Sequence, residues 1–145
     1  MISKADGVIE QSGVIPYRIK NGKIEVLLIT SSTGKRWVIP KGMIEFMMSP
    51  QDSAAKEAWE EAGVIGQVLP TTMGTYDYQK WGRTCRVETF LLQVETVLED
   101  WPEAKLRKRE WLSVKQAVKH IQEAELKQIL MALPDTLLTL QSPPE

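Results

Sequence analysis

The chain has 145 residues, of which 43% are hydrophobic and 26% are charged, proportions typical of one globular domain rather than a disordered or fibrous protein. The net charge of −1 gives no overall basic surface, which argues against stable binding to nucleic acid, although a local basic patch remains compatible with this balance.

The cysteine and histidine content restricts the kinds of metal site that the chain can form. There is one cysteine, Cys85, and one histidine, His120. An intramolecular disulfide is therefore impossible, and a zinc site built from these residue types is nearly excluded. Any metal must be held by carboxylates, which favours Mg²⁺ and leaves Mn²⁺ open.

No part of the sequence has the composition of a targeting or membrane segment. Residues 1–8 contain no apolar stretch of signal-peptide length, and no window approaches about 18 unbroken apolar residues. We therefore expect no membrane span and a reducing, cytoplasmic location.

Strand patterns dominate the first two thirds of the chain. Asn21-Gly22 is a strong signal for a hairpin turn, and a basic, glycine-containing turn at residues 79–83 separates two long alternating segments. The segments that we expect to form strands are residues 13–19, 24–30, 37–39, 67–78 and 84–95.

Helix signals begin at Ser49, which can cap a helix whose first turn contains Pro50 and the acidic Asp52. Gly63 is placed to end this helix in the left-handed conformation. A second helical region begins at Trp111 and includes residues 114–121 and 126–133, and residues 141–145 are expected to form a loose tail.

The order of strands, helix, strands and helix predicts an α/β or α+β sandwich, with helices packed on the faces of a mixed sheet. We expect residues 1–145 to form a single domain.

The first predicted helix has an acidic side and an apolar side when its residues are projected at about 100° each. The acidic side contains Glu57, Glu60 and Glu61, which repel one another at this spacing. A solvated surface would explain three acids equally well, whereas a bound cation would turn the repulsion into binding energy. The apolar stripe that we expect to face the sheet consists of Ala55, Ala58, Trp59 and Ala62.

The residues around these glutamates resemble the Nudix box. That motif is a glycine, five residues, a glutamate, seven residues, then Arg-Glu-aliphatic-any-Glu-Glu-any-Gly-aliphatic. Segment 42–64 departs from the motif at Met48, in place of the first glutamate, at Lys56, in place of the arginine, and more mildly at Ala58. The matching positions are Gly42, Glu57, Glu60, Glu61, Gly63 and Val64.

The resemblance implies the Nudix fold and metal-dependent cleavage of a phosphoanhydride bond. It implies that Glu57, Glu60 and Glu61 hold Mg²⁺ or Mn²⁺, that the Gly42 carbonyl is a further ligand, and that Lys56 holds the Glu57 carboxylate.

Two roles remain open within this resemblance. The general base is expected to be Glu57, with Glu88 as the weaker alternative. Glu45, three residues before Met48, is a candidate to replace part of the function of the missing glutamate.

Residues outside the box resemble the branch of the family that hydrolyses diphosphoinositol polyphosphates and diadenosine polyphosphates. These residues are Thr30-Ser31-Ser32, the run from Arg36 to Gly42, Leu98-Glu99-Asp100-Trp101, and the run from Arg107 to Trp111.

This branch implies a substrate with many phosphates, which converging cations would bind. Ser12 and Gly13 lack the basic residues that some inositol-polyphosphate enzymes carry, which favours dinucleoside polyphosphates. Trp81, in a polar turn, is a candidate to stack on a nucleobase, whereas Trp37, Trp59 and Trp111 are expected in the core. The cations that we expect to bind substrate are Lys35, Arg36, Lys41, Arg83, Lys108 and Arg109.

Two other functions remain open at this stage. One is a catalytically weak Nudix-like domain that binds a phosphorylated ligand, motivated by Met48 and Lys56. The other is removal of pyrophosphate from an RNA 5′ end, in which the basic clusters would contact the backbone. The sequence leaves both a monomer and a homodimer open.

Overall fold

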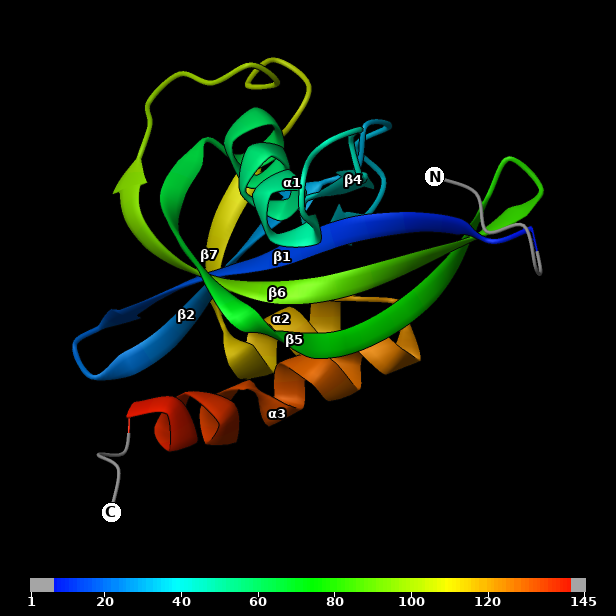
Figure 1. The fold of residues 1–145 in the computed structure, drawn as a ribbon. Helices are drawn as coiled ribbons and strands as arrows, with labels where there is room; N and C mark the ends of the chain where they lie inside the picture. The colour runs from blue at the N-terminus through cyan, green and yellow to red at the C-terminus, as the bar shows by residue number, and fades with distance from the viewer. Residues whose placement is uncertain (1–6, 142–145) are drawn as a thin grey trace.

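The computed structural model describes residues 7–141, which form a sheet with helices on both of its faces (Figure 1). The elements in chain order are β1 (Ile9–Lys20), β2 (Lys23–Thr30), β3 (Trp37–Val38), β4 (Lys41–Met43), α1 (Pro50–Glu57), the π-helical turn η1 (Ala58–Ala62), β5 (Val64–Lys80), β6 (Arg83–Val97), β7 (Arg109–Ser113), α2 (Val114–His120) and α3 (Ala124–Gln141). Across this range, no helix combines the length and the apolar composition that crossing a membrane requires.

The seven strands of the described residues make one mixed sheet in the order β3-β2-β1-β6-β5, with β4 paired to β1 and β7 paired to β2. β1 and β6 are parallel, and the other pairs are antiparallel. Positive φ angles at Asn21 (54°) and Gly22 (76°) form the predicted β1–β2 turn, and Trp81 (56°) and Gly82 (68°) form the β5–β6 turn.

β1 changes its antiparallel partner along its length, so that β2 and β4 pair with different parts of the same strand. Residues 11–13 pair with β4, whereas residues 17–20 pair with β2. Between these two stretches, the Val14 amide donates to the Pro40 carbonyl at 3.0 Å. The cavities described below are lined by residues from both sides of this divergence.

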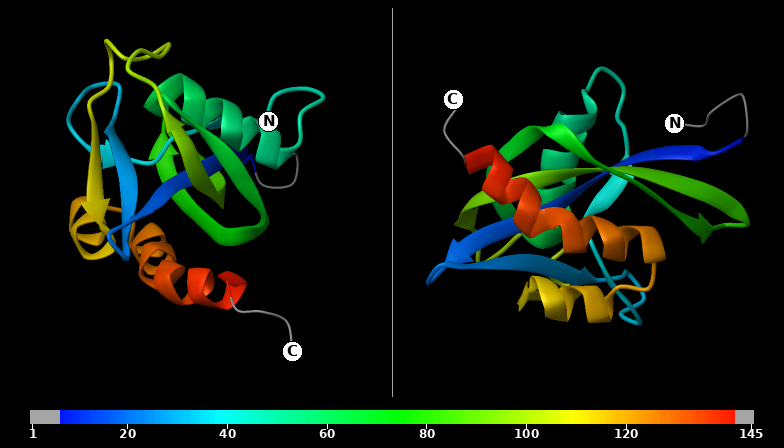
Figure 2. Two further views of the ribbon diagram at one scale, coloured as in Figure 1. Left: turned by 90° about the vertical axis from the view of Figure 1, so that its left-hand side faces the viewer. Right: turned by 90° about the horizontal axis from the view of Figure 1, so that it is seen from below.

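Alternate residues of the strands face two separate hydrophobic cores. Val14 faces the helix pair α1 and η1, while its neighbour Ile15 faces α2 and α3. Figure 2 shows α1 and α3 on opposite sides of the sheet. Because both faces are covered, the central strands are continuously apolar rather than alternating in polarity, and the mixed, helix-covered sheet predicted from the sequence is confirmed.

The predicted ends of the first helix are also confirmed. The Ser49 hydroxyl accepts a hydrogen bond from the Asp52 amide at 3.0 Å, Pro50 is the first helical residue, and Gly63 has φ +67°. The prediction was wrong for Trp59, which is 41% exposed. The buried stripe is instead Ala54, Ala58 and Ala62, because small side chains let the helix approach the sheet closely.

Two short strands were not predicted. β4 has three residues and no alternating apolar pattern, and it follows a proline that indicates a turn. β7 was expected to be helical from Trp111, but only Leu112 of that strand is buried, so its apolar signal is weak. The expected tail at residues 141–145 lies outside the described residues except for Gln141, which ends α3.

Candidate active site

Two glutamates of the acidic helix meet at the edge of β4. Glu57 ends α1 and Glu61 lies in η1, and both line a cavity together with Gly42. A Cβ atom at residue 42 would overlap the Glu57 carboxylate. Glycine is therefore required at this position for the carboxylate to lie against the β4 backbone.

Burial and mutual repulsion make this carboxylate pair hard to ionise fully. Burial, the charge of Glu61 and a hydrogen bond with its carboxyl raise the pKa of Glu57 from 4.5 to about 8. Burial also raises the pKa of Glu61, against the opposing effect of Arg107. Two carboxylates in such contact are stabilised by a shared proton or by a cation placed between them.

Glu61 is held by contacts from two distant segments. Its Oε1 accepts a hydrogen bond from the Lys41 amide at 3.1 Å, and its Oε2 lies 3.4 Å from an Arg107 guanidinium nitrogen. Arg107, with 11% of its side chain exposed, also donates to the Glu103 carboxylate and to the Thr30 carbonyl. This arginine therefore fixes the glutamate in the loop-lined wall of the cavity.

Lys56 does not take the expected role of holding Glu57. Its Nζ lies 2.5 Å from Glu45 Oε1 and 3.3 Å from Glu60 Oε1. The expectation was wrong because consecutive helical residues point about 100° apart, whereas residues four apart share a face. Glu45, proposed from the sequence to compensate for Met48, is thus the partner of Lys56.

The structure brings two of the three predicted metal ligands together. Glu60 is directed to Lys56, and within residues 7–141 no group of three or more His, Cys, Asp or Glu side chains is arranged to hold a metal ion. The Glu57–Glu61 pair nevertheless fits a hard divalent cation, because it supplies carboxylate oxygens that repel each other when both are ionised. The adjacent Gly42 carbonyl is an oxygen donor of the same chemical type.

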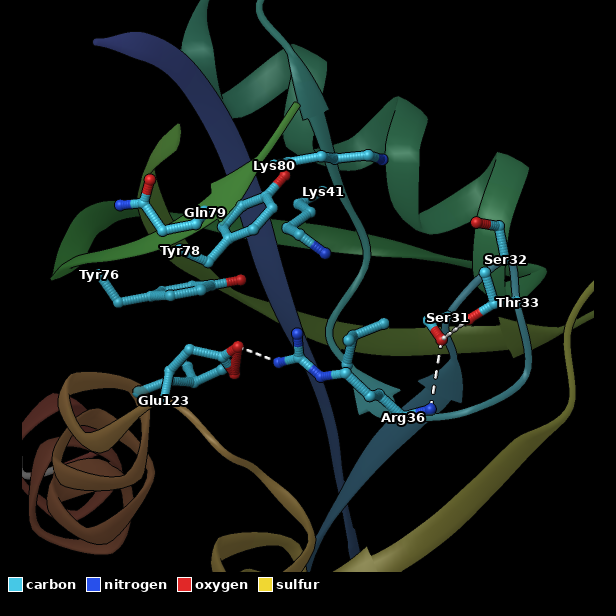
Figure 3. A pocket seen from close by; sticks show the side chains of 12 residues that line it. Ser31, Ser32, Thr33, Arg36, Lys41, Tyr76, Tyr78, Gln79, Lys80 and Glu123 are labelled. Carbon is cyan, nitrogen blue, oxygen red and sulfur yellow. Dashed lines mark hydrogen bonds and ion pairs between the residues drawn. The ribbon is translucent and has the colours of Figure 1, made fainter. Parts of the chain in front are cut away.

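Two cavities adjoin one another at this site, and the glutamate pair lines one of them. The proximal cavity, of about 230 Å³, is lined by Gly42, Glu57, Glu61 and Arg107, and the distal cavity, of about 210 Å³, by Arg36, Tyr76, Glu123 and Leu126. Figure 3 shows the distal cavity, with Lys41 and Lys80 above the Tyr76 ring. The wall that both cavities share consists of Ser31, Ser32, Val38, Lys41, Tyr78 and Lys80.

Lys41 connects the two cavities. Its Nζ lies 4.9 Å from the centre of the Tyr78 ring, and the Tyr78 hydroxyl donates to Gln11 at 2.6 Å. Burial lowers the pKa of Lys41, although the charges of Glu61 and Glu123 oppose this effect. A cation at this position can contact a phosphate group that passes from one cavity to the other.

Of the predicted substrate-binding cations, Arg36 and Lys41 line the cavities, whereas Lys35, Arg83 and Lys108 are exposed and do not. Arg109 was expected to bind substrate, but it does not line either cavity and instead holds neighbouring segments together. Its guanidinium stacks 3.9 Å from the Trp101 ring centre and donates to the carbonyls of Ala62, Gly63 and Leu98.

Two further candidates lie away from the glutamate pair. Glu88 lines a different surface cavity with Glu10 and Arg86. Trp81 is 72% exposed and packs against Lys80, its own neighbour.

Several residues of the cavities were not predicted. Tyr76 and Tyr78 alternate along β5 and therefore project to the same face, which was a detectable signal in the sequence. Glu123 has no such signal, because it lies in the connection between α2 and α3 and reaches the site only through the tertiary fold.

Comparison with known proteins agrees with this geometry. A family model described as NUDIX domain matches residues 10–133. The chain is 37% identical over 126 residues to Nudix hydrolase 21, chloroplastic, of Arabidopsis thaliana, a match that covers 83% of this chain and 63% of that protein. It is 40% identical over 101 residues to diphosphoinositol polyphosphate phosphohydrolase 3-alpha of Mus musculus, covering 68% of this chain and 60% of that protein.

Among solved structures, the crystal structure of C. elegans Ap4A hydrolase superimposes with a TM-score of 0.74 and 25% identity, covering 90% of this chain and 98% of that one. The chain spans about three fifths of the length of the two curated relatives named above. The predicted resemblance to the branch that contains diphosphoinositol polyphosphate and Ap4A hydrolases is confirmed. On the family match, these relatives and the shared fold, the chain belongs to the Nudix hydrolase family.

Proposed function

We propose that this protein hydrolyses a phosphoanhydride bond in a polyphosphorylated small molecule, in a reaction that requires Mg²⁺ or, as an alternative, Mn²⁺. The observation that carries the proposal is the contact between the Glu57 and Glu61 carboxyls beside Gly42, at the end of a cavity whose shared wall contains Lys41 and Lys80. This pair supplies hard oxygen ligands where the cations supply phosphate contacts.

A divalent cation bound to Glu57, Glu61 and the Gly42 carbonyl would neutralise phosphate charge and lower the pKa of a bound water. Glu60, which is paired with Lys56, would need to change rotamer to join these ligands.

The chain itself contributes a base and several positioning groups. Glu57 is the candidate general base, because its carboxyl lies beside Glu61 and Gly42 in the cavity where the reacting water would be held. Arg107 and the Lys41 amide keep Glu61 in one orientation. Lys41 and Lys80 bind the phosphates that are not cleaved.

The relatives indicate the substrate class to test first. One is named for diphosphoinositol polyphosphates and another for Ap4A. Both are chains of phosphate attached to a larger group, which is the shape that two adjoining cavities would accept.

The test is hydrolysis of a panel of diadenosine polyphosphates, diphosphoinositol polyphosphates, ADP-ribose, nucleoside triphosphates and 5′-triphosphorylated RNA in Mg²⁺. A parallel set contains EDTA. Cleavage of a small polyphosphate that EDTA abolishes supports the proposal. If the protein prefers RNA, its substrate is an RNA 5′ end rather than a small molecule. If it binds a compound without cleaving it, its role is ligand binding rather than hydrolysis.

A further inference from the structure

The two cavities differ in charge, and this difference bears on which group of the substrate each one holds. The proximal cavity contains the glutamate pair and Arg107, where the phosphates react under the proposed function. Each cavity is smaller than the roughly 300–1,000 Å³ of an ordinary small-molecule site. A substrate therefore extends across Lys41 and Lys80 from the proximal into the distal cavity.

The distal cavity has little net positive charge beyond the wall that it shares with the proximal one. Arg36 forms an ion pair with Glu123, the single acid among the described residues that line this cavity. The Glu123 side chain is only 13% exposed, so its charge is poorly screened by water. Figure 3 shows the Glu123 carboxylate next to the Arg36 guanidinium and on the side of the hydroxyl end of Tyr76.

The negative charge of Glu123 affects the pKa values of two neighbouring side chains, Tyr76 and Lys41. Burial raises the pKa of the Tyr76 hydroxyl well above its usual value, and the Glu123 charge adds to that shift. The remaining lining is partly apolar and aromatic, with Tyr76, Tyr78, Val38 and Leu126. The cavity thus combines aromatic and apolar side chains with one strong acceptor of hydrogen bonds.

A fully phosphorylated inositol does not match these groups. It carries a phosphate on every ring carbon, so placing the ring in the distal cavity would bring phosphate against the Glu123 carboxylate at a large electrostatic cost. A nucleoside has no charge of its own. It has hydroxyl and amino groups that can donate to a carboxylate, and a flat base that can pack on tyrosine.

We infer that Glu123 determines specificity, so that the distal cavity holds the nucleoside of a nucleoside-capped polyphosphate and excludes a phosphate-covered inositol ring. This inference rests on the proposed function and deepens it by naming the substrate class. Arg36 orients the carboxylate through their ion pair, and an N–H or O–H of the nucleoside donates to it.

The test measures binding separately from cleavage. Calorimetry in Mg²⁺ compares inositol hexakisphosphate with an analogue of diadenosine tetraphosphate in which a methylene group replaces every oxygen that bridges two phosphorus atoms, so that neither ligand contains a phosphoanhydride bond. The proteins are the wild type, Glu123→Gln, Glu123→Lys and the matched control Glu125→Lys. The control makes the same charge change two residues away, at an exposed position outside the cavity lining.

The wild type should bind the dinucleoside analogue at least about tenfold more tightly than inositol hexakisphosphate. Glu123→Gln, which keeps the side-chain volume, should narrow this ratio, Glu123→Lys should reverse it, and Glu125→Lys should leave it unchanged. Thermal unfolding of each variant shows whether it is folded.

A wild type that prefers inositol hexakisphosphate, or a ratio that is the same in folded Glu123→Gln and the wild type, overturns the inference. The proposed function fails on a different observation. If the predicted binding preference holds but neither diadenosine tetraphosphate nor a diphosphoinositol polyphosphate is cleaved, the hydrolysis proposal is lost and the assignment of Glu123 stands.

Discussion

The Lys56 ammonium lies 2.5 Å from the Glu45 carboxylate, and this ion pair joins the loop before α1 to the helix that carries the glutamates. Lys56 also contacts Glu60 at 3.3 Å. A lysine that replaces the arginine of the family motif is therefore paired with a glutamate displaced by three residues from the motif position that Met48 now occupies.

The first prediction concerns this pair. Glu45→Gln and Lys56→Met should each lower kcat/KM, because each disturbs the position of Glu60 and of the loop that leads into α1. The double variant should lose no more activity than the worse single variant, since both remove the same interaction. Asp52→Asn, on the exposed side of the same helix, is the control. Losses that multiply in the double variant would show that the two residues act independently.

The second prediction concerns the stability of the metal-free protein. The pKa of Glu57 is about 8 in the folded state and 4.5 in its ordinary setting, so between these values the folded protein holds a proton that the unfolded chain releases. The free energy of unfolding should therefore fall as the pH rises from about 4.5 to about 8. Urea denaturation in EDTA at several pH values measures this slope.

Glu57→Gln should flatten that slope, whereas Glu99→Gln, at an exposed position away from the cavities, should retain it. A slope of equal size in the wild type and Glu57→Gln would contradict the buried carboxyl pair.

The third prediction is that metal binding competes with this proton. Because the ligand must be deprotonated, apparent Mn²⁺ affinity should rise by up to about tenfold per pH unit between pH 6 and 8. Calorimetry in buffers of different ionisation enthalpy measures both the affinity and the proton released. Pure Glu60 coordination, which releases no proton from Glu57, would give a nearly pH-independent affinity.

The fourth prediction concerns Arg107, whose side chain is 11% exposed and contacts Glu61, Glu103 and the Thr30 carbonyl. Arg107→Met should destabilise the metal-free protein by about 3 kcal/mol, since it leaves a buried carboxylate without its cation. It should also lower kcat. Lys108→Met removes the neighbouring exposed cation and should change neither quantity appreciably. Equal unfolding midpoints for wild type and Arg107→Met would refute a positioning role.

The sequence predicted the parts of this protein that depend on local pattern. Ser49, Pro50 and Gly63 specify the ends of a helix through short-range backbone chemistry, and Asn21-Gly22 specifies a turn in the same way. The glutamates could be found because the family motif is contiguous. The prediction of which side of this helix is buried was only partly right. Which residues face the sheet depends on side-chain size as well as on polarity.

The rest of the site depends on contacts between distant segments. Arg107 lies 46 positions after Glu61 in the chain yet contacts its carboxylate, and Glu123 pairs with Arg36 across 87 positions. Several cations that appeared equivalent in the sequence differ in the structure, where Lys41 is half-buried between two cavities and Lys35 is exposed to solvent. Charge alone could not distinguish them, because exposure is set by the tertiary fold.

The fifth prediction follows from that separation. Lys80→Gln and Arg36→Gln should each raise KM by about tenfold, because the first removes a phosphate-binding cation and the second removes the ion-pair partner that orients Glu123. Lys35→Gln and Arg83→Gln remove the same charge outside the lining residues and should leave KM within about twofold of the wild type. Steady-state kinetics on the best substrate of the panel measures this. A similar rise in all four variants would indicate recognition by the whole surface rather than by the cavities.

The most direct test of the central claim is the rate at which Glu61→Gln cleaves that substrate at saturating Mg²⁺, compared with the wild type. The substitution keeps the size of the side chain while removing one charge of the pair. Our account predicts a folded protein that still binds the methylene-bridged analogue and whose kcat is lower by at least about 100-fold. A folded Glu61→Gln protein with kcat near that of the wild type would contradict a reaction that depends on the Glu57–Glu61 pair.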